Sequence, residues 1–134
     1  MAEKTEQTTE KPKEKYVFIA GGIGITPFRS ILLDLAFKKS LNEIILLYAN
    51  SNQEIAFKDE LDKLVKENPN LKIHYIIDPD RITLDLIKEF VPNFSDFIFF
   101  ISGTKSMVNA MKKNLLELNI KKKKIKSDYF PGYE

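Results

Sequence analysis

The segment from Tyr16 to Phe37 reads "YVFIAGGIGITPFRSILLDLAF" and joins two regular elements through a short turn. Its first five residues are apolar throughout, which is typical of a strand buried on both faces of a parallel sheet. Residues 28–37 show the apolar spacing of a helix. Three glycines and a proline occupy the eight residues 20–27 between them. This is either an ordinary sharp turn or a place where another group approaches the main chain closely.

Strand and helix patterns alternate through the rest of the chain. Apolar runs rich in Ile, Phe, Val and Tyr predict strands at residues 16–20, 43–49, 71–77, 96–102 and 125–130. Helical spacing predicts helices at residues 26–38, 54–67, 83–90 and 105–119. We expect Thr26 to cap the first helix, with Pro27 at its first position. Ser51 and Glu54 match a capping box before the second helix.

Five strands alternating with four helices predict an α/β fold of the Rossmann-like nucleotide-binding kind. We expect an open parallel sheet with helices on both faces and right-handed crossovers. The strands at residues 71–77 and 125–130 mix polar with apolar residues, which suits sheet edges. The predicted strand order is therefore 3-2-1-4-5. The polar residues 1–14 are expected to be a disordered tail or linker, and residues 15–134 to form one nucleotide-binding domain.

Composition narrows the classes of function. The chain has no Cys and a single His, His74, which excludes disulfides, thiolate catalysis and multi-histidine metal sites. No apolar run reaches the length of a membrane span and no signal peptide opens the chain, so we expect no membrane insertion and a cytoplasmic location. The net charge of +2 gives no reason to expect nucleic acid as a partner.

Two small-residue loops should meet where the winding of the sheet reverses. The loops "GGIGITP" (21–27) and "SGTKSM" (102–107) follow the first and fourth strands, and ligands of such sheets bind at this point. Glycines beside a helix N-terminus suit a diphosphate. No P-loop motif is present, and the dinucleotide fingerprint is matched only in part, because Pro27 replaces its last small residue and Ala49–Asn52 lack the usual acid. A dinucleotide site and a plain turn both remain open on these residues alone.

Four stretches in order resemble the ferredoxin–NADP reductase superfamily. Gly21–Pro27 resembles its "G-G-x-G-x-T-P" loop, and residues 46–61 are similar to its second strand and helix. Residues 102–107 are similar to its "C/S-G-P-x-x-M" turn, and residues 126–134 to an aromatic C-terminus. The resemblance covers residues 15–134 and implies a domain that presents the hydride of NAD(P)H to a flavin. The family's FAD-binding barrel and its R-x-Y-[ST] motif are absent from the chain, so FAD is expected on a missing or partner domain, in cis or in trans.

The resemblance also implies the residues of the site. The cofactor-binding residues that it implies are Gly21, Gly22, Gly24, Ile25, Thr26, Pro27, Asn50, Asp78, Ser102, Gly103, Thr104, Met107 and Phe130. Ser102 stands where relatives have Cys beside the reacting carbon, and Tyr133, with Phe130, resembles the aromatic that shields the flavin. Ser102 and Tyr133 are accordingly the expected catalytic residues. Thr104 replaces the proline of the family turn.

The choice between NAD and NADP is expected at the end of the third strand. Asp78-Pro79 stands there, followed by Asp80, where NADP-using relatives have Ser-Arg; Asp78-Pro79 is also a common start of a plain turn. A carboxylate accepts hydrogen bonds from a ribose diol and repels a phosphate, so we expect a preference for NADH. Arg81 could offset this by pairing with a phosphate. Arg29 is expected in a salt bridge, and His74 in a structural role.

The sequence thus supports the dinucleotide-binding half of a flavin-dependent reductase, inactive without its FAD-binding domain and passing electrons to an unidentified protein. The alternative is a non-enzymatic module that binds the dinucleotide and senses redox state. Hydride transfer after an FAD-binding domain is added would favour the reductase over the redox-sensing module.

Overall fold

The computed structural model describes residues 13–129, without the side chains of residues 128 and 129, and contains one five-stranded sheet. Its strands are β2 (Lys15–Gly21), β3 (Glu43–Asn50), β4 (Leu71–Ile77), β5 (Phe97–Gly103) and β6 (Ile125–Tyr129). Every neighbouring pair is parallel, in the order β4-β3-β2-β5-β6. The predicted order 3-2-1-4-5 is confirmed, with the first and fourth strands adjacent at the centre.

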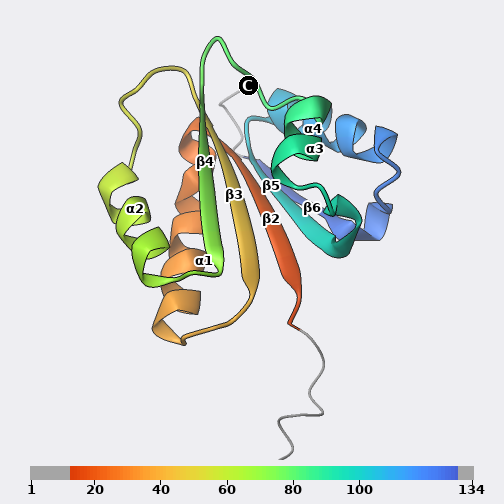
Figure 1. Cartoon of the computed structure of the whole chain (residues 1–134). Coiled ribbons are helices and arrows are strands. Elements are labelled where there is room, and N and C mark those ends of the chain that lie inside the picture. Colours follow the sequence, from red (N-terminus) through yellow and green to blue (C-terminus); the bar gives the residue numbers. More distant parts are fainter. Residues whose placement is uncertain (1–12, 130–134) are drawn as a thin grey trace, which may run out of the picture.

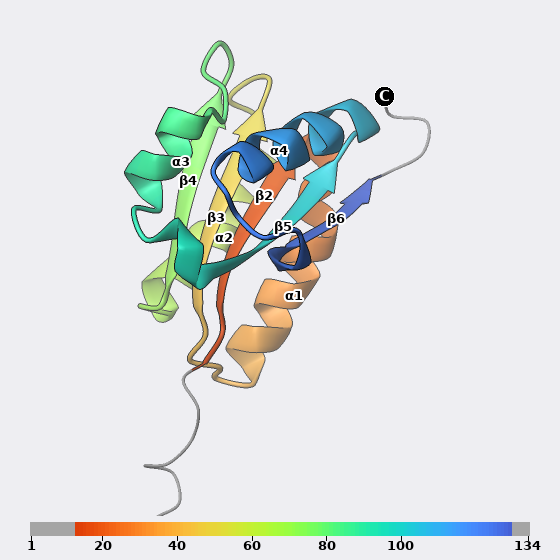
Figure 2. The same ribbon diagram turned by 90° about the vertical axis from the view of Figure 1, so that its right-hand side faces the viewer.

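Four helices cover the two faces of the sheet (Figure 1). They are α1 (Ile25–Phe37), α2 (Lys58–Glu67), α3 (Leu84–Phe90) and α4 (Lys105–Glu117). Helices α1 and α2 lie on one face, and α3 and α4 on the other. Short 3-10 turns complete the described chain at Gly22–Gly24 (η2), Phe94–Asp96 (η3) and Lys122–Lys124 (η4). Figure 2 shows α4 lying across the sheet close to the ends of β2 and β5.

Alternate residues of the inner strands face two separate cores. Phe18 and Leu46 pack under α1 and α2, whereas Val17, Ile19 and Leu47 pack under α3 and α4. All five are at most 2% exposed. Because successive side chains of a strand point to opposite faces, a strand covered on both sides must be apolar at every position. This explains why the inner strands read as unbroken apolar runs.

Two of the predicted helix starts are wrong. Helix α1 begins at Ile25, and its N-cap is Gly24 rather than Thr26. The turn η2 runs directly into the helix, with the Ile25 N–H donating to the Gly22 carbonyl, so Thr26 already lies inside the helix and does not cap it. Pro27 is consequently the third helical residue rather than the first. A proline is tolerated in the first turn because its missing N–H has no partner in the helix there.

Helix α2 also begins later than the capping box predicts. It starts at Lys58, after Phe57 takes a left-handed conformation with φ 64°. The Glu54 N–H instead donates to the side chain of Asn52 at 2.8 Å, which closes a local turn. Helix α4 begins at Lys105, as predicted, and α3 begins at Leu84, one residue after its predicted start. The hydroxyl of Thr83 caps α3 by accepting from the Leu86 N–H at 3.1 Å, and Thr104 caps α4 in the same way.

His74 has the structural role that was predicted for it. Its ring stacks on Phe90 with 3.8 Å between ring centroids, which ties β4 to the end of α3. Partial burial lowers the pKa of His74 below its usual 6.5, the nearby Lys72 lowers it further, and Glu89 opposes them. The folded state therefore binds a proton at this imidazole less readily than the unfolded state does.

We expect the free energy of unfolding to fall as the pH is lowered through about 6.5. The unfolded chain protonates His74 first, so acid favours unfolding until the pH drops below the lowered pKa of the folded state. The variant His74→Phe retains an aromatic ring for stacking and should lose this slope. Urea unfolding of both proteins between pH 5 and 7.5 measures the effect, and equal slopes would contradict it. The ammonium of Lys58 and the hydroxyl of Tyr75 lower the pKa of Asp62. Asp62 therefore changes the pH dependence of stability only at more acidic pH.

Candidate functional site

The two small-residue loops meet at the carboxyl ends of β2 and β5, as predicted. Gly24, the last residue of η2, lies directly against the main chain of β5. A Cβ added to Gly24 would lie 2.0 Å from the carbonyl oxygen of Ser102 and 2.8 Å from the nitrogen of Gly103. Neither distance is tolerable between non-bonded atoms. The absence of a side chain at Gly24 is therefore required by the contact between the two loops.

Gly22 has a different role from its neighbours. Its φ is +54°, in the left-handed region that other residues avoid, and a Cβ added there would have no described atom within 4 Å. Gly22 also lines the cleft described next. It is thus the glycine of this loop at which an outside group could reach the main chain.

An open cleft of about 1060 Å³ lies at the carboxyl ends of the strands, on the side covered by α3 and α4. It is lined by Gly21, Gly22, Ile23, Ala49, Asn50, Ser51, Asp78, Asp80, Arg81, Ile82, Thr83, Leu84, Thr104, Ser106, Met107, Ala110, Met111 and Asn114. These residues come from the last residues of β2 and β3, from the loops after β2, β3, β4 and β5, from the start of α3 and from α4. Such a position, beyond the carboxyl ends at the reversal of winding, is where doubly wound sheets bind ligands.

The cleft collects some of the predicted site residues and leaves others elsewhere. Gly21, Gly22, Asn50, Asp78, Thr104 and Met107 line it, whereas Gly24, Ile25, Thr26, Pro27, Ser102 and Gly103 do not. Phe130 and Tyr133 lie outside the described residues, as does most of the predicted tail. The predicted site thus divides into a group on the cleft and a group beneath or beside it.

Ser102 and Ile25 are buried under the loop rather than exposed on its surface. Ile25 is 1% exposed and belongs to the core beneath α1, so only its main chain could take part in binding. Ser102 is 2% exposed, and its hydroxyl makes no hydrogen bond to any described residue. Thr26 is exposed on the first turn of α1. The catalytic role expected of Ser102 remains a prediction.

The charges of the cleft are concentrated at the loop after β4. Among its lining residues, Asp78, Asp80 and Arg81 are charged, and all three are exposed. The end formed by the two glycine loops is uncharged. There the Nδ2 atom of Asn50 is buried. The Asn50 side chain lies beside the hydroxyl of Tyr48, where it opposes the rise in the pKa of Tyr48 that burial causes, so it is on the face of β3 that packs under α1 and α2. The arrangement offers carboxylates at one end and neutral main-chain donors at the other.

Sequence reasoning missed the wall of the cleft that α4 provides. Ser106, Ala110 and Asn114 recur every four residues and so lie on one side of the helix. In the sequence, this row of small and polar residues lies beside the apolar row of Met111 and Leu115. It could have indicated that one side of the helix faces a ligand site rather than the core. The loop residues from Arg81 to Leu84 were also missed, although they follow the third strand and Arg81 had been noted only for its charge.

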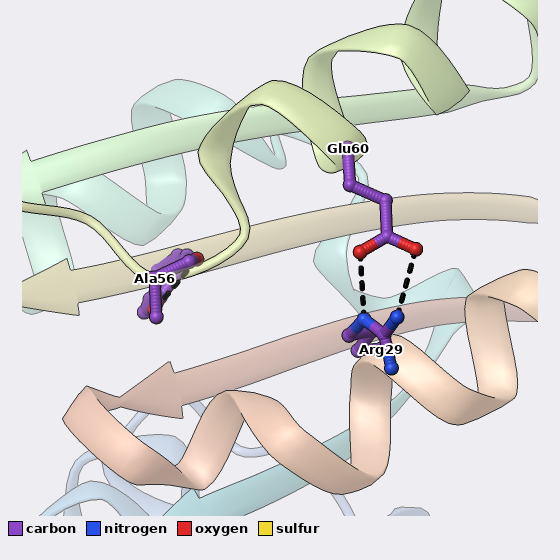
Figure 3. Close-up of polar contacts among 4 residues, drawn as sticks. Arg29, Ala56 and Glu60 are labelled. Carbon is purple, nitrogen blue, oxygen red and sulfur yellow. Dashed lines mark hydrogen bonds and ion pairs between the residues drawn. The ribbon is translucent and has the colours of Figure 1, made fainter.

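Arg29 forms the salt bridge that the sequence predicted (Figure 3). Its Nε and Nη2 atoms donate to the two carboxylate oxygens of Glu60 at 2.8 and 2.9 Å, which joins α1 to α2. The guanidinium also lies 4.7 Å from the centre of the Phe57 ring. These contacts raise the pKa of Arg29, chiefly through the hydrogen bond to Glu60. Arg29 is therefore engaged between helices and does not line the cleft.

The sequence model of the oxidoreductase NAD-binding domain matches residues 18–113. NADH-cytochrome b5 reductase 1 of Candida glabrata is 37% identical over 120 residues, which cover 79% of this chain and 42% of that protein. The cytochrome b5 reductase domain of Ulva prolifera nitrate reductase is 30% identical, with a TM-score of 0.72 over 90% of this chain and 49% of that one. A flavohemoglobin of Malassezia yamatoensis, solved with bound FAD and heme, is 26% identical, with a TM-score of 0.79 over 93% of this chain and 34% of that one.

The fold and the cleft define a nucleotide-binding domain of the doubly wound class. The chain belongs to the oxidoreductase NAD-binding domain family, the dinucleotide-binding module of reductases related to ferredoxin–NADP reductase. It spans less than half the length of the NADH-cytochrome b5 reductase that it matches. Within residues 13–129, no helix is long and apolar enough to cross a membrane.

Replacing Gly24 by Ala should destabilise the fold strongly, because the added methyl group meets main-chain atoms that cannot move aside. We expect a loss of at least about 3 kcal/mol of unfolding free energy, at the upper end of overpacking effects. Gly22→Ala is the matched control. Its methyl group points into open space, so only the left-handed backbone conformation is penalised, by about 1 kcal/mol. Denaturant unfolding of the two variants measures the difference, and equal losses would contradict the contact at Gly24.

Proposed function

We propose that this chain binds NADH in the cleft and presents it to FAD held on a separate domain, as one half of a flavin-dependent reductase. The single observation that carries the proposal is the cleft itself. It lies at the reversal of winding and joins an uncharged glycine-loop end to a carboxylate end. A bound nicotinamide supplies a hydride and the flavin accepts it, so the chain's own task is binding and orientation.

The described residues fit a dinucleotide. The cleft of about 1060 Å³ lies at the upper end of the usual size range of small-ligand pockets, which suits a ligand with two nucleotides. The diphosphate would lie near Gly22, where a Cβ would have no neighbour within 4 Å. Thr104 caps α4 through the Met107 N–H at 3.3 Å, which fixes the second loop beside the first.

The flavin and the electron acceptor belong to other parts of the assembly. The Malassezia yamatoensis relative was solved with FAD bound, and this chain covers 34% of it. The proposal therefore includes an FAD-binding domain as the immediate partner, joined in cis or supplied in trans, and a further protein that takes the electrons. Thr26, Phe130 and Tyr133 are proposed to lie at the nicotinamide end, facing that partner. Ser102 is proposed to lie beneath the same end, under the glycine loop.

Titration of the purified chain with NADH tests the binding step. We expect the amide NMR signals of Gly21 and Gly22 to move in a saturable way, because both residues line the cleft. Those of Lys38 and Lys39, at the far end of α1, should not move. Signals at Gly22 that stay fixed at millimolar NADH would refute the proposed function.

A second arm adds the purified FAD-binding domain of a related reductase and follows the flavin absorbance. Loss of that absorbance on adding NADH, at a rate that depends on the concentration of this chain, supports the reductase. Saturable NADH binding without any such rate would favour the redox-sensing alternative.

The carboxylates at the loop after β4 are proposed to select NADH over NADPH. Asp78 and Asp80 line the cleft on either side of Pro79 and would face the ribose of the adenosine. A carboxylate 4 Å from a 2′-phosphate costs about 1–4 kcal/mol, between the limits for water and for a protein surface. The name of the Candida glabrata relative, an NADH-dependent reductase, agrees with this preference.

The double variant Asp78→Asn, Asp80→Asn should reduce the preference for NADH at least about fivefold, which corresponds to the lower limit of that repulsion. Asparagine keeps the size of the side chain and one of its two acceptor oxygens, so the change removes the charge with little change of shape. Arg81→Gln is the companion variant, and it should weaken NADPH binding alone. Dissociation constants for both cofactors provide the measurement, and an unchanged ratio in the double variant would place the selecting residues elsewhere.

A further inference from the structure

Met107 occupies an unusual place at the junction of the two loops. Its side chain lies across the ends of β2 and β5, where Gly21 and Gly103 stand on neighbouring strands. A Cβ added to Gly21 would lie 3.3 Å from both the Sδ and the Cε atoms of Met107. One added to Gly103 would lie 2.8 Å from the same sulfur. The thioether thus occupies the space of a Cβ at Gly103 and would be in tight contact with a Cβ at Gly21.

The backbone of Met107 is held in place independently of this contact. Its N–H donates to the hydroxyl of Thr104 at 3.3 Å, so it belongs to the capped first turn of α4. The side chain packs against the core under α3 and α4, and at the same time lines the cleft. Met107 is therefore the part of the cleft floor that touches both glycine loops.

We propose that Met107 is a positioning residue that sets the spacing of the two loops and the depth of the cleft where the dinucleotide would bind. On this proposal, Gly21 and Gly103 lack side chains because of Met107 rather than because of the ligand. The inference rests on the proposed function for its link to NADH, but the packing relation stands on the geometry alone.

The four glycines of the two loops fall into three groups, according to which atoms lie where a Cβ would stand. Gly24 accommodates the main chain of β5, and Gly22 lies under open space. Gly21 and Gly103 accommodate a flexible thioether. A methyl group on Gly103 would displace that thioether, because the strand behind it is fixed by neighbours on both sides. The displaced group would move toward the cleft, which is the open side of Met107.

A double-mutant cycle between Gly103→Ala and Met107→Ala tests the proposal. In the natural background, Gly103→Ala should weaken NADH binding about tenfold. In the Met107→Ala background, the same change should cost less than about threefold, because the new methyl group enters vacated space. The coupling is therefore more than about threefold, within the usual range for residues in contact. A glycine required by the ligand would instead give equal losses in both backgrounds, and that result would overturn the proposal.

Two matched controls are available in the same cleft. Gly22→Ala should show no coupling to Met107→Ala, because a Cβ at Gly22 has no described neighbour within 4 Å. Met111→Ala should show no coupling to Gly103→Ala, although Met111 is a methionine one turn further along α4 and also lines the cleft. Coupling of similar size in either control would contradict the specific role of Met107.

The same cycle measured by thermal unfolding does not depend on NADH. Met107→Ala should relieve most of the loss of melting temperature caused by Gly103→Ala, and should shift the amide NMR signals of Gly21 and Gly103 in the absence of ligand. If the natural chain fails to bind NADH while this relief is observed, the proposed function is wrong and the packing role stands. Additive losses of melting temperature would refute the packing role.

Discussion

The contact between Gly24 and the main chain of β5 is the constraint on which the rest of the site depends. With no Cβ on Gly24, the turn η2 lies against the carbonyl of Ser102, and the loops after β2 and β5 come together. This contact fixes where α1 begins, and it leaves Gly22 facing outward in its left-handed conformation. A side chain at Gly24 would separate the loops and remove the junction that closes one end of the cleft.

The site is built from the ends of buried strands rather than from a dedicated group of polar side chains. Parallel strands that are apolar on both faces are fixed by two cores, so their carboxyl ends form a rigid edge. Polar residues are added to this edge by the loops and by the row on α4. The result is a cleft with charge at the loop after β4 and main-chain donors at the opposite end. That polarity suits the proposed dinucleotide, whose diphosphate would take the main-chain donors and whose adenosine ribose would take a carboxylate.

Much of this could be predicted from the sequence, and the errors share one cause. The strand positions and their order followed from the apolar runs and from the polar residues of β4 and β6. Strands buried on both faces are apolar at nearly every position, whereas edge strands also carry polar residues. The starts of α1 and α2 were wrong because Thr26 and Ser51 fit capping patterns that compete with main-chain turns. The structure selects the 3-10 turn before α1 and the left-handed Phe57 before α2. Such choices depend on contacts between distant parts of the chain.

The sequence by itself determined the class of fold, the edge of the sheet at which a ligand would bind and the family to which the chain belongs. It did so because periodicity, glycine spacing and the order of motifs are local properties. Only the tertiary structure decided what surrounds each glycine. Gly24 meets the carbonyl of Ser102 on a separate strand, and Gly103 meets the thioether of Met107, which folds back from the first turn of α4. Only the tertiary structure placed the row on α4 in the wall and buried Ser102 beneath the loop. These outcomes depend on which atoms the packing of separate elements brings within van der Waals distance.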